Sequence, residues 1–197
     1  MGDTLVPATQ IKSLIETLIE NGVIQGDLVE SWNKKSQQMK EKEELLQKTN
    51  DGNEGMLKVV EGFARGVNGF EKNRPKAYRW CQKLHDVGSV KGRARLGEYL
   101  VKGLGTQKSF TLGMLHLGQA AFAGSDLAAY LLGYAFAKGK YGMPVKEKEA
   151  IFWFRKCLGP CAYSHLSSKT KAKAQEHLNE LLDNQNRGSD EGSASSD

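Results

Sequence analysis

Two stretches of the chain, GSVKGRARLGEYLVKG at residues 88–103 and GSDLAAYLLGYAFAKG at residues 124–139, align without a gap. The second stretch begins 36 positions after the first, and both start with Gly-Ser, carry Leu-Gly in the middle and end with Lys-Gly. A looser similarity extends towards the N-terminus, because Gly66 precedes Gly103 by 37 positions. Self-similarity at this period is typical of stacked pairs of helices. The sequence therefore predicts a helical repeat array.

Three pairs of helices are expected in this array, one pair in each repeat. Along the first helix of a pair, an aliphatic residue is followed by a bulky one and then by a glycine, at spacings of four and three. These spacings place the residues on one face of a helix, and the glycine ends the helix. The three sets are Val59, Phe63 and Gly66; Leu96, Leu100 and Gly103; and Leu132, Phe136 and Gly139. The repeats are accordingly expected at residues 53–88, 89–124 and 125–159.

The second helix of each pair carries a small residue and, three positions later, a large one. The pairs are Ala77 with Trp80, Gly113 with His116, and Ala150 with Trp153. The small residue lets neighbouring helices approach closely, and the large residue fills the space beside it. In the second repeat, Gly113 is expected to weaken its helix by about 1 kcal/mol relative to alanine. His116 is expected to be packed and hydrogen-bonded, because no nucleophile accompanies it in the sequence.

The first 52 residues are expected to form an N-terminal helical hairpin or arm, 1–52. Five aliphatic residues make one apolar stripe on its first helix, residues 10–21: Ile11, Leu14, Ile15, Leu18 and Ile19. This stripe either packs on the neighbouring helix or first repeat, or docks another chain. The second helix, residues 27–49, is rich in charge. Such a helix is a solvated arm whose Trp32 end packs on the body or, alternatively, one strand of a weak coiled coil.

Beyond the third repeat, Gly159-Pro160 is expected to break the helix. Residues 160–183 are then expected to supply a C-terminal capping helix, because a terminal repeat needs a cap with a polar outer face. The last residues, 184–197, are rich in Ser, Gly and Asp, a composition that predicts a disordered tail.

The third repeat resembles a known family. The segments AAYLLGYAFAKG at residues 128–139 and EAIFWFRK at residues 149–156 resemble the Sel-one-like repeat, a relative of the tetratricopeptide repeat, and AAFAGSD at residues 120–126 resembles its inter-repeat junction. This resemblance implies an all-α fold: an α/α superhelix, or solenoid, of about three helix-turn-helix repeats. It also implies an adaptor that assembles protein complexes and shares no catalytic residues. Some bacterial members carry a cysteine pair in each repeat, which this chain lacks.

The composition narrows the classes of function. The chain has 197 residues and a formal net charge of +5, a mild basic excess that is not by itself a nucleic-acid signature. Its three cysteines are too few and too unevenly placed for a disulfide framework, which favours a reducing compartment: the cytoplasm or, alternatively, the nucleus. No apolar run of about 18 residues could span a bilayer, so no membrane partner is expected.

The sequence contains little that is typical of catalysis. It has no phosphate-binding glycine loop, metalloprotease helix or serine elbow, so we expect no enzyme activity and no small-molecule substrate. Cys157, Cys161 and His165 are spaced four and four and could begin a zinc site, with Cys81 or His177 as a fourth ligand. Because free cysteine is usually a small core residue, we expect no metal and no cofactor.

Charge recurs along the first helices of the repeats. A basic residue lies six positions after the aliphatic residue named above for each first helix. Nearby equivalent positions of the repeats carry further charged residues and tyrosines. Because first helices line the concave side of such a superhelix, these positions predict a partner-binding groove. Its predicted residues are Lys58, Arg65, Arg95, Tyr99, Lys102, Tyr134 and Lys138. Alternatively, Glu61–Arg65 and Glu98–Lys102 are ordinary ion pairs on a solvated face, each contributing about 0.2–0.5 kcal/mol; both interpretations can hold together.

The sequence thus supports two hypotheses of function. The first is a non-catalytic protein–protein interaction scaffold that binds a partner segment, an acidic peptide or helix, on its concave face. The alternative is a basic helical-repeat protein that binds nucleic acid, because residues 58–108 contain twelve basic and four acidic side chains. Few aromatic side chains in this segment are free to stack on bases. The identity of the partner, the oligomeric state and the docking of residues 1–52 stay open.

Overall fold

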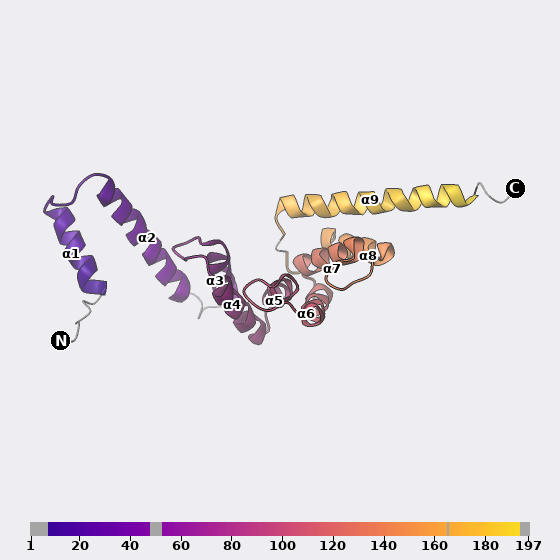
Figure 1. Cartoon of the computed structure of the whole chain (residues 1–197), viewed down its shortest axis with the longest axis horizontal. Helices are drawn as coiled ribbons and strands as arrows, with labels where there is room; N and C mark the ends of the chain where they lie inside the picture. Colours follow the sequence, from indigo (N-terminus) through magenta and orange to yellow (C-terminus); the bar gives the residue numbers. More distant parts are fainter. Residues whose placement is uncertain (1–7, 48–52, 165, 194–197) are drawn as a thin grey trace.

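A computed structural model describes residues 8–47, 53–164 and 166–193 of the chain. This part of the chain is almost entirely helical, which confirms the predicted all-α solenoid (Figure 1). Its helices are α1 (Ala8–Glu20), α2 (Asp27–Gln47), α3 (Asn53–Arg65), α4 (Arg74–Asp86), α5 (Val90–Lys102), α6 (Phe110–Phe122), α7 (Asp126–Lys138), α8 (Glu147–Leu158) and α9 (Ser168–Ser193).

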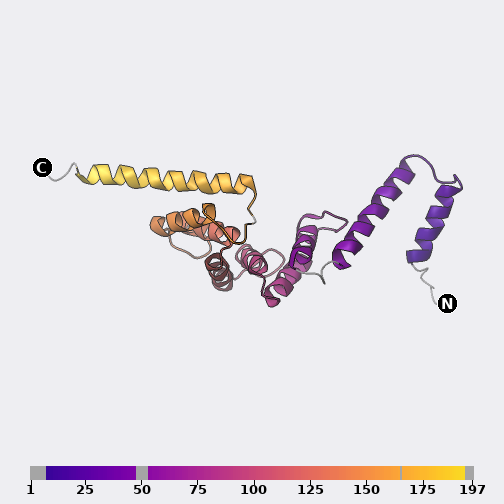
Figure 2. The ribbon, with the colours of Figure 1, turned by 180° about the vertical axis from the view of Figure 1, so that it is seen from behind.

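Three helix pairs form the body of the molecule. The pairs α3/α4, α5/α6 and α7/α8 fall within residues 53–88, 89–124 and 125–159, and each helix packs on the one before it. Figures 1 and 2 show the pairs following one another along the long axis of the molecule. The first helices α5 and α7 contact each other directly. Among the second helices, His85 of α4 packs on His116 of α6, and Phe122 of α6 packs on Trp153 of α8. First helices thus form one side of the array and second helices the other.

The 36-residue frame recurs because the same residues begin and end α5 and α7. The hydroxyls of Ser89 and Ser125 accept hydrogen bonds from the backbone N–H three positions later, at 3.2 and 3.4 Å. Such caps satisfy N–H groups that a helix start leaves without partners. Both helices end at a glycine in the left-handed region, with φ of 67° at Gly103 and 59° at Gly139. Glycine adopts this backbone without steric cost.

In the second repeat, α5 and α6 approach each other through facing glycines. A Cβ atom at Gly113 would lie 2.5 Å from Cγ1 of Val101, and one at Gly97 would lie 2.8 Å from Cγ of Leu117. Each glycine also faces the backbone carbonyl of the other, at 3.0–3.1 Å from the same Cβ positions. Gly113 therefore does more than weaken α6, because the spacing between the two helices depends on it.

His116 does not make all of the hydrogen bonds expected of it. Its Nδ1 atom is buried and has no hydrogen-bond partner in the described part of the chain. The ring instead packs edge-to-face on His85 of α4, with centroids 4.8 Å apart. Burial, His85 and Arg93 lower the pKa of His116, which favours its neutral form. The expected packing is present, but the expected hydrogen bonding is wrong for Nδ1.

Most of the buried hydrophobic side chains belong to two clusters. One lies between the first and second repeats and includes Cys81, Leu84 and Tyr99. The other lies between the second and third repeats and α9, and includes Leu117 and Phe154. Each repeat thus buries its apolar face against the next one, which is how stacked repeats build a core.

The N-terminal helices form an open hairpin that extends away from the body (Figure 1). α2 meets the loop between α3 and α4, where the ammonium of Lys42 lies 5.4 Å from the ring centroid of Phe70 and Gly69 lies against the backbone of Gln38. The prediction that the Trp32 end of α2 makes this contact is wrong. α1 packs extensively on no other helix of the described residues.

The C-terminal helix is longer than the sequence indicated. α9 packs on α8 through Ala174, Leu178 and Leu181, as expected for a cap. However, it continues to Ser193, so residues 184–193 are helical rather than disordered, and 194–197 lie outside the described residues. Extending an existing helix avoids the costly nucleation step, and a polar stretch can therefore continue it.

The facing glycines of α5 and α6 lead to a first prediction. Gly113→Ala should lower the free energy of unfolding by about 1–3 kcal/mol, because overpacking outweighs the gain in helix propensity. Gly118 lies on the same helix, and a Cβ there would meet nothing within 4 Å. Gly118→Ala should therefore stabilise the protein by about 0.5–1 kcal/mol. Urea denaturation of both variants measures the change in the free energy of unfolding. Equal changes for the two variants would contradict the close approach of α5 and α6.

Candidate functional site

Two adjoining cavities lie along the first helices of the repeats. One, of about 490 Å³, is lined by α3, α5 and the segment 166–167; the other, of about 310 Å³, is lined by α5, α7 and the start of α9. The cavities share Arg65, Arg95, Leu166 and Ser167, so together they form one surface, called here the concave groove.

Five of the seven predicted partner-binding residues line the concave groove: Lys58, Arg65, Arg95, Tyr99 and Lys102. The other two lie further along α7, beside α9. The ring of Tyr134 is 6.2 Å from that of His177, and Nζ of Lys138 is 3.9 Å from a carboxylate oxygen of Glu180. α9 therefore covers the part of α7 to which the sequence extended the groove.

Glu98 on α5 holds two of the basic residues in place. Its carboxylate accepts hydrogen bonds from Arg95 at 2.9 Å and from Lys102 at 2.7 Å, and its side chain is 13% exposed. Burial raises the pKa of the Glu98 carboxyl, but the two cations outweigh burial, so its pKa lies below the ordinary value. Glu98 is therefore ionised at neutral pH and fixes both cations at the wall of the groove.

The remaining cations of the groove differ in their partners. Arg65 pairs with Glu61 at 2.7 Å on an exposed helix face, so the i,i+4 ion pairs expected from the sequence are present alongside the groove. Lys58, Lys169 and Lys173 also line it, and within the described residues none of them has an ion-pair partner. These three ammonium groups are free to meet an incoming anion.

The tyrosines of the groove have different exposures. Tyr99 is almost fully buried, and burial raises the pKa of its hydroxyl to about 12, so it supports the groove more than it presents a surface. Tyr130 of α7 also lines the second cavity and is only partly buried, but it is not among the predicted residues of the groove. It occupies the position equivalent to Ala94, so no periodic signal marked it.

A buried carboxylate ties the α8–α9 connection to the groove. Asp126, in the first turn of α7, is fully buried and accepts hydrogen bonds from the backbone N–H of Leu166 at 3.1 Å and from the Ser164 hydroxyl at 2.9 Å. It also accepts one from the backbone N–H of Leu127 at 2.7 Å. This arrangement places Leu166 and Ser167 over the first helices. The second repeat carries Val90 at this position, so the repeat pattern did not mark Asp126.

The candidate zinc ligands are dispersed. Cys81 and Cys157 belong to different core clusters, and burial raises the pKa of each thiol to about 12. The Cys161 thiol donates to the backbone carbonyl of Lys156 at 3.3 Å. His177 packs on Phe154, and the described residues contain no group of three side chains suited to a metal. His165 lies outside the described residues.

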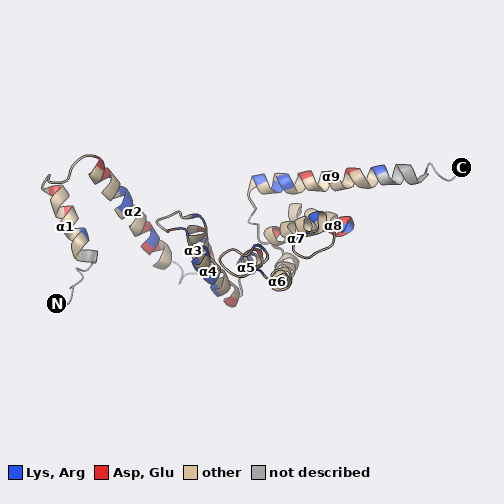
Figure 3. Cartoon of the chain, in the orientation of Figure 1, with Lys and Arg blue, Asp and Glu red and all other residues tan. Residues whose placement is uncertain are grey.

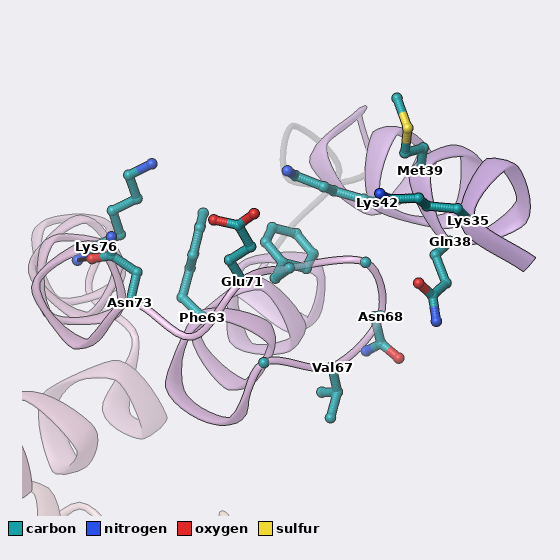
Figure 4. A pocket seen from close by; sticks show the side chains of 13 residues that line it. Lys35, Gln38, Met39, Lys42, Phe63, Val67, Asn68, Glu71, Asn73 and Lys76 are labelled. Carbon is teal, nitrogen blue, oxygen red and sulfur yellow. Dashed lines mark hydrogen bonds between the residues drawn. The ribbon is translucent and has the colours of Figure 1, made fainter. Parts of the chain in front are cut away.

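A third cavity lies away from the concave groove. It measures about 530 Å³ and separates α2 from the loop between α3 and α4 (Figure 4). Figure 4 shows Lys35, Met39 and Lys42 on one side and Phe63 and Glu71 on the other. This cavity is the seam where the N-terminal arm meets the body.

Comparison with known proteins identifies the repeats. The model of the Sel1 repeat family matches residues 62–84, 90–125 and 126–156, which include most of the three helix pairs. No curated protein matches the chain. Among the described residues, none of the helices has the length and apolar character needed to cross a bilayer.

Solved structures of similar fold include two bacterial proteins. The Sel1 repeat protein from Oxalobacter formigenes is 24% identical, with a TM-score of 0.48, over 52% of this chain and 41% of that one. The protective antigen c5321 of uropathogenic Escherichia coli strains, described as displaying an SLR fold, is 22% identical, with a TM-score of 0.55, over 71% of this chain and 28% of that one. The chain thus spans less than half the length of either protein. At this identity the likeness to c5321 shows the fold alone.

The Asp126 interaction leads to a second prediction. Asp126→Ala should lower the free energy of unfolding by about 1–3 kcal/mol, because the buried N–H of Leu127 and the partly buried N–H of Leu166 lose their acceptor. Ser164→Ala removes only one of the same hydrogen bonds and should cost about 1 kcal/mol. Urea denaturation of both variants provides the comparison. An Asp126→Ala variant as stable as Ser164→Ala would show that the carboxylate does not anchor the segment.

The lowered pKa of Glu98 leads to a third prediction. A carboxyl whose pKa is lower in the folded state stabilises the protein above its unfolded pKa and loses this effect as pH falls through the folded value. Wild type should therefore be more stable than Glu98→Gln at neutral pH, and the difference should shrink in acid below the ordinary glutamate pKa of 4.5. Thermal unfolding across pH measures it; a constant difference would contradict the ion-pair network.

Proposed function

The chain carries three Sel1 repeats, and from this premise we propose that it is a non-catalytic scaffold that binds an acidic peptide or helix of a protein partner in the concave groove. Sel1 repeat proteins generally act as protein-interaction scaffolds. The observation that carries the finer proposal is the charge of the groove, whose lining contains six basic residues and three acidic ones. The basic residues are Lys58, Arg65, Arg95, Lys102, Lys169 and Lys173.

The arrangement of these cations supports an extended acidic ligand. All three carboxylates, Glu54, Glu61 and Glu98, already pair with other cations of the chain, so they leave the free lysines uncompensated. Lys58 lies in one cavity and Lys169 and Lys173 in the other. A segment that reaches all three would run along the array and cross from one repeat to the next. Opposite charges on the groove and on an acidic peptide speed association and fix the register of the bound peptide.

The chemistry of the cysteines supports a role without catalysis. A cysteine acts as a nucleophile through its thiolate, which requires a lowered pKa and access to solvent. Burial instead raises the pKa values of Cys81 and Cys157 to about 12, and both side chains are buried. These thiols are core residues.

The distribution of basic residues favours a peptide over nucleic acid. Four of the twelve basic residues in segment 58–108 line the concave groove. Others are engaged elsewhere: Lys91 binds Glu54 at 2.6 Å, and the Lys83 ammonium lies 4.4 Å from the ring centroid of Trp80 on α4. A phosphate backbone needs a continuous basic track, whereas these cations are divided between two sides of the array.

A charge-reversal experiment tests the groove. Reversing Arg65, Lys102 and Lys138 would place new carboxylates beside Glu61, Glu98 and Glu180 and disturb the fold. The free cations avoid this difficulty, so the test variant is Lys58→Glu/Lys169→Glu/Lys173→Glu. The matched control, Lys34→Glu/Lys40→Glu/Lys148→Glu, changes the charge equally at exposed positions outside the groove.

Random peptides displayed on phage supply the ligands for a fourth prediction. Wild type and the control should select peptides rich in Asp and Glu, and the groove variant should bind them at least about tenfold more weakly, since each lost charge pair weakens a complex by a kcal/mol or more. Fluorescent single-stranded and duplex oligonucleotides are titrated in parallel. Equal peptide binding by all three proteins would refute the groove. Tight oligonucleotide binding with a steep salt dependence would instead establish the nucleic-acid alternative.

A further inference from the structure

α6 differs from every other helix of the repeats on its outward side. Its thirteen residues, Phe110–Phe122, contain no charged side chain. Leu112, Leu115 and Phe122 are 52%, 54% and 71% exposed, although they are large and apolar. Gly118 lies between Leu115 and Phe122 along the helix, and the space above it is open. An exposed apolar strip of this kind usually marks an interaction surface.

The repeat frame does not require this strip. When the second helices are aligned on their small residues, Leu112 is equivalent to Lys76 in the first repeat and Glu149 in the third. Leu115 is equivalent to Arg79 and Phe152. The first repeat is thus charged at both positions and the third at one of them. Stacking of the repeats fails to explain the apolar side chains of α6, because these side chains point away from the core. They form a feature of the second repeat alone.

The strip continues onto α8 through a group of aromatic rings. Phe122 and Phe152 each pack edge-to-face on Trp153, with centroids 5.3 and 5.0 Å apart. The ammonium of Lys156 lies 4.8 Å from the centroid of Phe122. We call this surface the convex patch: Leu112, Leu115, Gly118, Phe122 and Phe152. Bases lie on the elements beside it: the Lys156 ammonium lies at the rings, and Arg79 and Lys83 are exposed on α4, whose His85 packs on His116 of α6.

The chain itself contains a second uncovered apolar surface, on α1. Ile11 and Leu14 are 47% and 60% exposed, and α1 packs extensively on no other helix of the described residues. Around it, residues 8–30 carry four carboxylates and one lysine (Figure 3). α1 is therefore an amphipathic helix in an acidic setting, whereas the convex patch is an apolar surface with a basic border. The two are complementary in both character and charge.

α1 cannot fill the convex patch of its own chain in this arrangement. The hairpin holds α1 at one end of the elongated molecule, and α6 lies beyond α3, α4 and α5 (Figures 1 and 2). We propose that α1 of one copy docks on the convex patch of a second copy. Because different surfaces meet, the contact is head-to-tail, and the pair keeps one free patch on the first copy and one free α1 on the second. Repetition of this contact builds rings or filaments of the scaffold.

Two single substitutions test the proposal on the full chain. Leu14→Asp places a charge on α1, and Leu115→Asp places one in the convex patch. Both positions are exposed, so circular dichroism and thermal unfolding should show an unchanged fold. Val145→Asp, at a loop position 62% exposed, is the matched control. Sedimentation velocity should show that wild type and the control self-associate with rising concentration, whereas each test variant stays monomeric.

An equimolar mixture of the two test variants identifies the surfaces that meet. The Leu115→Asp chain retains an intact α1, and the Leu14→Asp chain retains an intact patch. A head-to-tail contact therefore predicts a dimer that grows no further. A mixture that stays monomeric would show that α1 and the patch do not meet, and would overturn the proposal. Monomeric wild type at every concentration, or self-association of either variant to the extent of wild type, would overturn it as well.

Discussion

The close approach of α5 and α6 at Gly97 and Gly113 is the contact on which the rest of the array depends. These two helices join the first repeat, which packs on α5, to the third, which packs on α6. Any side chain at either glycine would meet backbone or a buried side chain of the opposite helix. The separation of the two helices is thus set by backbone contact, and backbone contact cannot adjust by a change of rotamer. Rigid spacing at the centre fixes the direction in which both ends of the solenoid continue.

Much of this architecture could be predicted from sequence because it is periodic. Ser89 and Ser125 cap equivalent helices, Gly103 and Gly139 end them, and each of these residues acts on neighbours within a few positions. Local rules of this kind repeat with the sequence. The groove was partly predicted for the same reason: Arg65 and Lys102 recur on one face of successive first helices, and both line it.

The features that sequence did not predict involve partners far apart in the chain. Asp126 binds Leu166, 40 positions later, and nothing in the second repeat corresponds to this pair. Lys138 faces Glu180 because α9 folds back over α7, which no repeat position indicates. The predicted end of α9 was wrong for another reason. A helix that has already formed can be extended without a new nucleation step, and amino-acid composition alone does not show where such an extension stops. The periodic part of the fold and the presence of a capping helix could thus be predicted from the sequence, whereas the long-range contacts and the end of that helix could not.

The two sides of the solenoid can serve different partners because the helix pairs keep them apart. First helices contribute the charged side chains of the concave groove, and second helices contribute the convex patch. Between them lies the glycine contact of α5 and α6, so a residue on one side can change without disturbing the other. If the proposed functions of both sides hold, a peptide in the groove and a second copy on the patch occupy separate surfaces of one repeat. Assembly would then multiply the number of grooves in one particle, and avidity for a partner with several acidic segments would rise without any new contact.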